Sequence, residues 1–236
     1  MTSPSWVALA FAIGRCLIKG GGLDFGCIVH DGGQKYMQGA NERRVIACMQ
    51  LRHPDVLKFQ ETVEVEEKGK FVIYLVTEPV QSLDLVIKSL VFEGNDYEKF
   101  AMMGLQQIVS ALSFLGNDCS LIHGNVCSRS VMVTDTLDWK LHAFDLTTEH
   151  ALVAQISAGP PLLASSWLVA PQYKSGELGR SEWDVIAGGP VWAVDAWGLG
   201  CLIQEVFSKV PLTKMEDLKR LDCIPLKIKP YYQVSN

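Results

Sequence analysis

The segment Leu121–Asp145 constrains the fold of this chain more than any other. Two short apolar runs, residues 130–134 and 139–143, flank the polar turn Asp135–Asp138 and predict a β-hairpin. A short strand and a polar loop come before this hairpin. The clearest amphipathic helix of the sequence is predicted directly upstream, at Asp96–Leu115. The order of these elements therefore predicts a loop held between a long helix and a hairpin.

The loops of this segment resemble two signatures of protein kinases, H-R-D-L-x-x-x-N and D-F-G. The resemblance places Asn125 where a kinase carries its catalytic base, Ser130 where it carries a magnesium ligand, and Ala143 at the aspartate of D-F-G. The first loop runs from His123-Gly124-Asn125 to Ser130, and the second reads Ala143-Phe144-Asp145.

The residues at these three positions lack the chemistry of phosphoryl transfer. A kinase needs a carboxylate that accepts the proton of the attacking hydroxyl, and oxygen ligands for magnesium. The amide of Asn125 is not a base, and the hydroxyl of Ser130 is a weaker ligand than an amide carbonyl. Ala143 has no ligand atom. We therefore predict no catalytic residue, no bound metal and no cofactor.

Two other residues of the segment allow an alternative. Asp145 lies two residues after Ala143, and a local register shift would bring its carboxylate to a metal. The other interpretation is that Asp145 is exposed or caps a turn. His123 is predicted to be a packed structural histidine and not a base.

The N-terminal third also departs from the kinase pattern. Strands, and one helix at Asn41–Leu51, are predicted there. The alignment places Ile28 where a kinase strand carries a phosphate-binding lysine, and Arg44 where a helix carries the glutamate that pairs with it. Gly20–Gly22 reads as a turn, without the spacing of a phosphate-covering loop. Glu78 lies where the backbone of a kinase would hold adenine. Nucleotide binding is therefore not expected.

The C-terminal two thirds are predicted to be mainly helical. Helices are expected at Ser82–Leu90, with Ser82 as the cap, and at Val191–Phe207, with a polar connection at Lys174–Pro190. With the strands upstream, this pattern predicts an α+β, bilobal fold like that of protein kinases. The boundaries follow the change in pattern: the small antiparallel lobe at residues 1–78 and the helical lobe at 79–236.

The helix at Val191–Phe207 contains the kinase-like spacing D-x-W-x-x-G, with Asp195 and Trp197 in structural roles. A buried aspartate needs hydrogen-bond partners. We expect Asp195 to accept hydrogen bonds from the backbone around His123 and Gly124. Upstream, Gln172 replaces the glutamate of the kinase A-P-E motif, which removes the carboxylate that anchors that segment in kinases.

Composition excludes several functional classes. The net charge of the 236-residue chain is −5, and its basic residues are dispersed, so nucleic acid is not expected as a direct partner. The seven cysteines form no C-x-x-C pair, which predicts neither a zinc site nor a redox motif. No apolar run is long enough to cross a membrane. These features predict a soluble, cytoplasmic protein.

From about Gly26 to Tyr232 the chain resembles the N-terminal-kinase-like, or Scy-like, pseudokinases, and its later part resembles plant or algal members. The motifs that carry the resemblance are Leu51-Arg52-His53-Pro54, Val76-Thr77-Glu78-Pro79-Val80, Ile122-His123-Gly124-Asn125-Val126, Trp139-Lys140-Leu141, Ala170-Pro171-Gln172-Tyr173 and Trp197-Gly198-Leu199-Gly200-Cys201-Leu202.

The resemblance implies an inactive domain that binds protein partners, among them vesicle-coat components, in Golgi-to-ER traffic, with a peripheral location at Golgi membranes. It also implies HEAT-type repeats after the kinase-like region. The sequence ends at Asn236, so the helical lobe is expected to be incomplete and the helix Val191–Phe207 incompletely covered. The alternative function is an atypical kinase that retains ATP binding and weak phosphoryl transfer.

Overall fold

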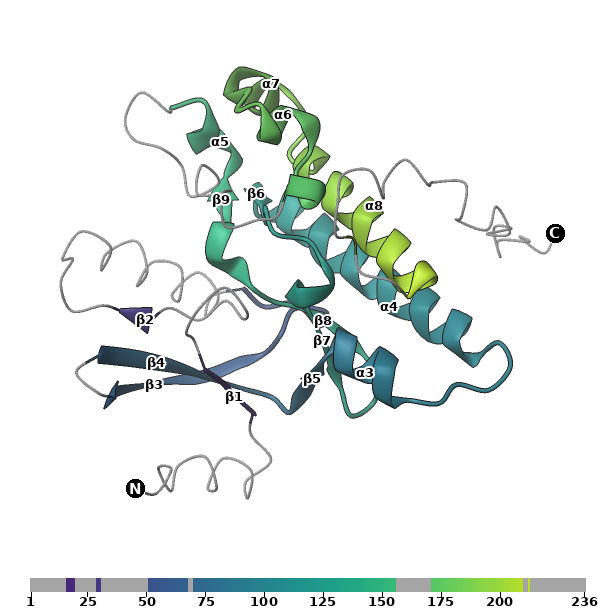
Figure 1. The fold of residues 1–236 in the computed structure, drawn as a ribbon. Helices are drawn as coiled ribbons and strands as arrows, with labels where there is room; N and C mark the ends of the chain where they lie inside the picture. Colours follow the sequence, from purple (N-terminus) through teal and green to yellow (C-terminus); the bar gives the residue numbers. More distant parts are fainter. Residues whose placement is uncertain are drawn as a thin grey trace.

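In the computed structural model, an antiparallel sheet lies beside a larger, mainly helical part (Figure 1). The predicted α+β architecture is confirmed. The structure describes residues 16–19, 29–30, 51–67, 70–155, 171–209 and 212. The predicted helix at Asn41–Leu51, together with Ile28 and Arg44, therefore lies outside the described residues, apart from Leu51 itself. The lobe boundary at residue 78 stays a prediction.

The antiparallel sheet is built around the apolar strand β4. β3 pairs with β4 over nearly its whole length, with a register irregularity between Phe59 and Glu61, and β1 and β2 pair with β4 as well. β3 begins at Phe59, and Val56 before it forms a parallel bridge with Leu141. The bounds are Cys16–Lys19 for β1, Val29–His30 for β2, Phe59–Glu67 for β3 and Lys70–Thr77 for β4.

A second, three-stranded antiparallel sheet joins the two parts. The predicted hairpin is confirmed as β7, Val131–Thr134, and β8, Trp139–Leu141. β5, Val80–Ser82, pairs with β7 and was not predicted, since three residues carry too little periodicity to be recognised. The helix that follows, α3, spans Leu83–Ser89 as expected, but the Ser82 side chain makes no capping hydrogen bond.

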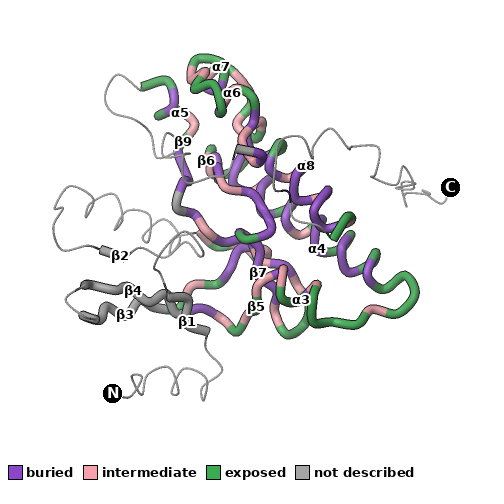
Figure 2. Tube along the Cα trace, in the orientation of Figure 1, coloured by how far each residue is buried: buried purple, intermediate pink, exposed green. Residues whose placement is uncertain are grey.

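Two long helices, α4 and α8, lie side by side and form the centre of the helical part (Figure 1). α4 spans Asp96–Ser113 and continues as one π-helical turn, Phe114–Asp118, and α8 spans Ala193–Ser208. Both helices agree with the predicted ranges to within two residues. Figure 2 shows that buried residues follow one side of α4, as its apolar stripe requires.

Smaller elements complete the helical part. The predicted polar connection at Lys174–Pro190 is wrong, because it contains two short helices that bury Leu178 and Ile186 in a satellite apolar cluster. None of the described helices is long and apolar enough to cross a bilayer. The remaining elements are β6, Leu121–Ile122, its partner β9, Thr148–Glu149, α5, His150–Val153, α6, Gly176–Gly179, and α7, Trp183–Gly188.

Two glycines let the helices approach their neighbours closely. The ring of Trp139, which is fully buried, lies so close to Gly104 in α4 that a Cβ there would come within 2.1 Å of it. A Cβ on Gly198 in α8 would lie 2.7 Å from the carbonyl oxygen of Val126. Glycine at these two positions therefore determines how tightly α4 packs on β8, and α8 on the polar loop.

We predict that Gly198→Ala lowers the free energy of unfolding by about 1–3 kcal/mol, because the loop or the helix must shift to make room. Gly200→Ala is the matched control in the same helix. Its added Cβ meets no heavy atom of its surroundings within 4 Å, so it should be neutral or stabilising by about 0.5–1 kcal/mol. Urea denaturation measures both, and equal stability of the two variants would contradict the packing described.

Candidate functional site

The polar loop between β6 and β7 is fixed by the carboxylate of Asp195. The backbone N–H of His123 donates to Asp195 Oδ2, and that of Gly124 donates to Oδ1, both at 2.8 Å. Asp195 is 5% exposed. The hydrogen bonds predicted from the sequence are therefore present, and they attach α8 to the loop. Gly124 has φ of +76°, a left-handed conformation that favours glycine and aims its N–H at the carboxylate.

His123 is fully buried and neutral. Its Nδ1 accepts from the Asn125 N–H at 3.2 Å, and its Nε2–H donates to the His142 carbonyl at 2.9 Å, so a neutral ring satisfies both partners. Burial lowers the pKa of His123 to about 4. The ring also packs edge-on against Phe144, with centroids 5.1 Å apart. These contacts agree with the predicted structural role of His123.

His142 was missed by the sequence interpretation. It follows β8, and its Nε2 lies 3.0 Å from the Arg129 carbonyl, which joins the hairpin to the loop. Burial lowers the pKa of His142 to about 4 as well. The sequence feature that could have indicated a buried role is the polar His142 directly after an apolar strand. The sequence does not show which group His142 would bond to.

Ser130, at the position assigned to a magnesium ligand, uses its hydroxyl within the loop. The hydroxyl donates to the Cys127 carbonyl at 2.8 Å and accepts from the Cys127 N–H at 3.0 Å. The side chain is fully buried. A metal bound by this oxygen would compete with both hydrogen bonds, so the geometry favours a local structural role.

Asn125 and Ala143 belong to the two segments that meet at the buried His123 ring, which bonds to the Asn125 N–H and to the carbonyl of His142. Asn125 is half-buried, and its Oδ1 lies 3.9 Å from the Cys127 thiol. Ala143 has φ of +64°, a left-handed conformation that is unusual for a residue with a Cβ. This turn leads into a 3₁₀ helix, Phe144–Leu146, and buries Phe144. The side chain of Asp145 lies outside the described residues, so its alternative metal role stays a prediction.

Glu78, at the position assigned to the adenine-binding segment, is hydrogen-bonded to Lys58, the residue before β3. Its Oε1 accepts from the Lys58 N–H at 2.9 Å, and its own N–H donates to the Lys58 carbonyl at 3.2 Å. These two hydrogen bonds therefore hold the β4–β5 connection, where Glu78 lies, against the residue that precedes β3. A small cavity of about 220 Å³ lies beside it, lined also by His53, Val56 and Lys140.

Gln172 anchors its segment with an amide where a kinase has a carboxylate. Its Nε2 donates to the Leu212 carbonyl at 2.8 Å, a bond that an ionised glutamate cannot make. Its own carbonyl lies 3.3 Å from Trp197 Nε1 and 3.4 Å from the Cys201 thiol of α8. The segment is therefore anchored through the amide of Gln172, although the carboxylate of the kinase motif is missing. Trp197 is 40% exposed, and its indole N–H ties the segment to α8.

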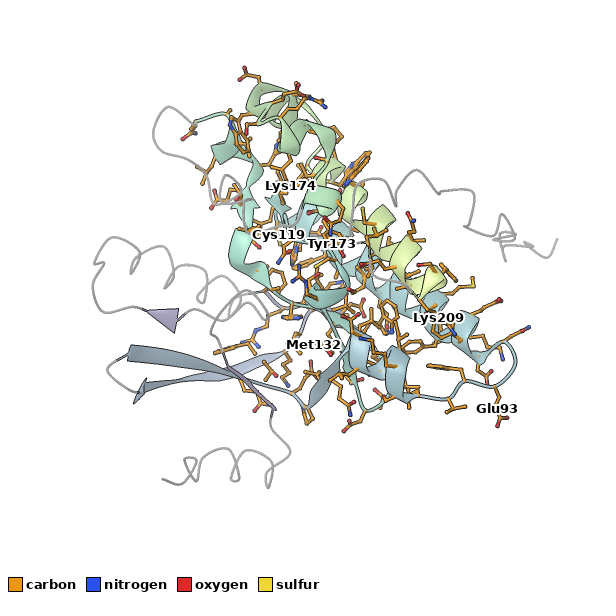
Figure 3. All side chains as sticks on the ribbon, in the orientation of Figure 1. Glu93, Cys119, Met132, Tyr173, Lys174 and Lys209 are labelled. Atoms are coloured by element: carbon orange, nitrogen blue, oxygen red, sulfur yellow. The ribbon has the colours of Figure 1, made fainter. Side chains whose placement is uncertain are left out.

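A buried glutamate, Glu205 of α8, extends this network. The Tyr173 hydroxyl and the Leu212 N–H both donate to its Oε1, the latter at 2.9 Å. Burial raises the pKa of Glu205. Figure 3 shows Tyr173 beside α8. Among the described residues, no group of three or more histidine, cysteine or carboxylate side chains is arranged to hold a metal ion.

Residues 30–227 match the family described as "Protein tyrosine and serine/threonine kinase". A Dictyostelium discoideum protein named "Probable inactive serine/threonine-protein kinase scy1" is 37% identical over 78% of this chain and 21% of its own length. The "Protein kinase domain-containing protein ppk32" of Schizosaccharomyces pombe is 31% identical over 70% of this chain and 23% of its own length.

Human "SCY1-like protein 2" is 24% identical over 71% of this chain and 19% of its own length. The chain thus spans about a fifth of the length of these relatives. The predicted resemblance to Scy-like proteins is confirmed by these matches. The resemblance to plant or algal members stays a prediction.

We predict that Asp195→Ala lowers the free energy of unfolding by about 1–3 kcal/mol, because it leaves two buried N–H donors without an acceptor. Glu98→Ala, at an exposed position of α4, is the control and should stay within about 0.5 kcal/mol of the parent. Thermal and urea melts measure both. An Asp195→Ala variant that melts like the parent would show that the loop is held by other contacts.

We also predict that acid destabilises the fold between pH 6.5 and 4. Two buried histidines have pKa values lowered from 6.5 to about 4, so the stability they provide is present above pH 6.5 and is lost as the pH falls through 4. Burial raises the pKa of Asp195 to about 6, although the hydrogen bonds from Gly124 and His123 act to lower it. Protonation of Asp195 therefore stabilises the fold as the pH falls. The destabilisation from the two histidines is larger, because two groups are shifted in the opposite direction.

The measurement is the urea midpoint at pH 7 and at pH 5. His142→Gln keeps a donor for the Arg129 carbonyl and removes one titrating group, so the difference between the two midpoints should shrink. A difference that His142→Gln leaves unchanged would assign the acid sensitivity to other groups.

Proposed function

Because the chain belongs to the protein tyrosine and serine/threonine kinase family, we propose that it is a catalytically inactive kinase-fold domain that binds protein partners as a scaffold. The observation that carries this proposal is the use of the Ser130 hydroxyl. Both of its hydrogen bonds go to Cys127, at the position assigned to a magnesium ligand. The relative from Dictyostelium discoideum, which is named a probable inactive kinase, supports the same conclusion.

The sequence adds the remaining support. Asn125 provides no base, and Ala143 provides no ligand, at positions where phosphoryl transfer needs carboxylates. Losing a general base alone lowers a rate by about 10²–10⁴. The assignments of Ile28 and Arg44 remove the lysine–glutamate pair that holds nucleotide phosphates in kinases. A nucleotide is therefore not part of the proposed function.

The proposed cellular role is adaptor function in intracellular membrane traffic between Golgi and ER, in the cytoplasm and at the periphery of Golgi membranes. Its support is the resemblance to Scy-like proteins, and vesicle-coat components are the proposed class of partner. The lobe boundary at residue 78 belongs to the same proposal, with β4 in the small lobe and β5 in the large one.

We predict that the purified chain transfers no phosphate to itself or to generic protein substrates, in ATP and magnesium, above a reaction without protein. The same preparation should show no melting shift that saturates at millimolar ATP. Radiolabelled phosphate transfer and thermal shift measure the two expectations. An active kinase domain, tested in parallel, verifies the assay.

The alternative, an atypical kinase with rearranged ligands, makes the opposite prediction. Magnesium-dependent transfer that disappears in Asp145→Ala would establish it and end the proposal. Transfer that persists in Asp145→Ala would indicate a contaminating kinase, to be removed by further purification before the comparison is repeated.

A further inference from the structure

A second hollow lies away from the polar loop, between the α3–α4 connection, α4 and the β7–β8 turn. Its volume is about 630 Å³, and its walls are residues 90–93, the facing side of α4 and residues 136–138. We call it the α4 groove. This volume is in the range of sites that take a few side chains of a ligand. In Figure 3, Glu93 at its rim points outward from the α3–α4 connection.

The floor of the α4 groove is closely packed and hydrogen-bonded. The Phe100 ring is buried and packs against Phe92 and Trp139, with centroids 5.1 and 5.3 Å away. Gln107 of α4 spans the floor: its Nε2 donates to Asp138 Oδ1 at 2.9 Å, and its Oε1 accepts from the Trp139 N–H at 2.8 Å. The groove is therefore preformed, which reduces the entropy lost when it binds a ligand.

Apolar side chains line the rim of the α4 groove and stay open to solvent. Val91 is 92% exposed, Met103 is 65% exposed, and Leu137 is 44% exposed. Exposed apolar groups around a hollow are typical of protein interaction sites. Met103 adds an adaptable thioether, which suits a surface that accepts different side chains.

The charge of the α4 groove is negative. Glu93, Asp96 and Asp138 line it, and no lysine or arginine of the described part of the chain does. Two lysines lie near the groove without lining it. Lys99 forms an ion pair with Asp96, with 3.0 Å between Nζ and Oδ1. Lys140 donates to the Pro54 carbonyl, and its charge favours the ionised form of Asp138. Hydrogen bonds from Thr136 and Gln107 lower the pKa of Asp138, so its carboxylate is ionised at neutral pH.

We propose that the α4 groove docks a short segment of a partner protein that carries basic residues beside apolar ones. The apolar rim matches the aliphatic side chains of such a segment, and the carboxylates of Glu93 and Asp138 match its positive charge. Nucleic acid and anionic lipid surfaces are repelled by the same carboxylates. The inference extends the proposed scaffold role, and it names a surface separate from the His123–Ser130 loop.

The test starts with random peptides displayed on phage and selected on the immobilised 236-residue chain. The probe is then a fluorescein-labelled synthetic peptide of the enriched sequence, titrated by anisotropy. A second peptide, with its lysines and arginines replaced by glutamine, is the charge control. We expect basic and apolar residues to be enriched, and the charge control to bind more weakly in low salt but not in about 1 M salt.

Matched variants locate the binding. Val91→Ser should weaken binding about 3- to 10-fold through lost apolar burial, and Glu93→Gln about 2- to 5-fold through lost charge. Val185→Ser on α7 and Glu98→Gln on α4 change similar exposed residues outside the groove and should leave affinity unchanged. Asp138 is left intact because its hydrogen bonds hold the β7–β8 turn.

The proposal is overturned if no peptide is enriched, if enriched peptides lack basic residues, or if groove and control variants bind equally. Self-association that Val91→Ser abolishes, measured by sedimentation, would assign the groove to a second copy and overturn it too. None of these outcomes bears on phosphate transfer, so the docking inference and the proposed inactivity fail separately.

Discussion

The pair of hydrogen bonds that Asp195 accepts from the backbone of His123 and Gly124 organises the centre of this domain. Through it, a carboxylate on the core helix α8 determines the path of the loop that leads into the β7–β8 hairpin. The close approach at Gly198 brings the helix near enough for these bonds. A buried carboxylate is stable only with such partners, so the helix and the loop must fold together.

Around this connection, the polar side chains bind to the protein itself. The Ser130 hydroxyl bonds twice to Cys127, Glu78 accepts from the backbone of Lys58, and Gln172 donates to the Leu212 carbonyl. The sequence interpretation assigned these three residues to kinase positions that serve metal binding, nucleotide binding and segment anchoring. In this structure their polar groups hold neighbouring segments of the chain together.

Sequence patterns predicted the long elements well and the short ones poorly. Helix α4 and the β7–β8 hairpin have clear periodicities, and both are found within two residues of their predicted bounds. The strand β5 and the helices α6 and α7 were missed because they are too short to show a period, and long-range packing stabilises them. The burial of Asp195 could be predicted because a kinase-like spacing placed it on an apolar helix.

The sequence by itself determined the family resemblance, the α+β architecture and the identity of the groups at the assigned catalytic positions, since these depend on residue type and order. Only the tertiary structure decided where polar side chains find partners: His142 with the Arg129 carbonyl, and Gln172 with Leu212. It also decided that Glu93 and Asp138 line one groove. Such contacts join residues 13 to 45 positions apart, and local sequence patterns carry no information at that range, because chain folding alone brings those groups together.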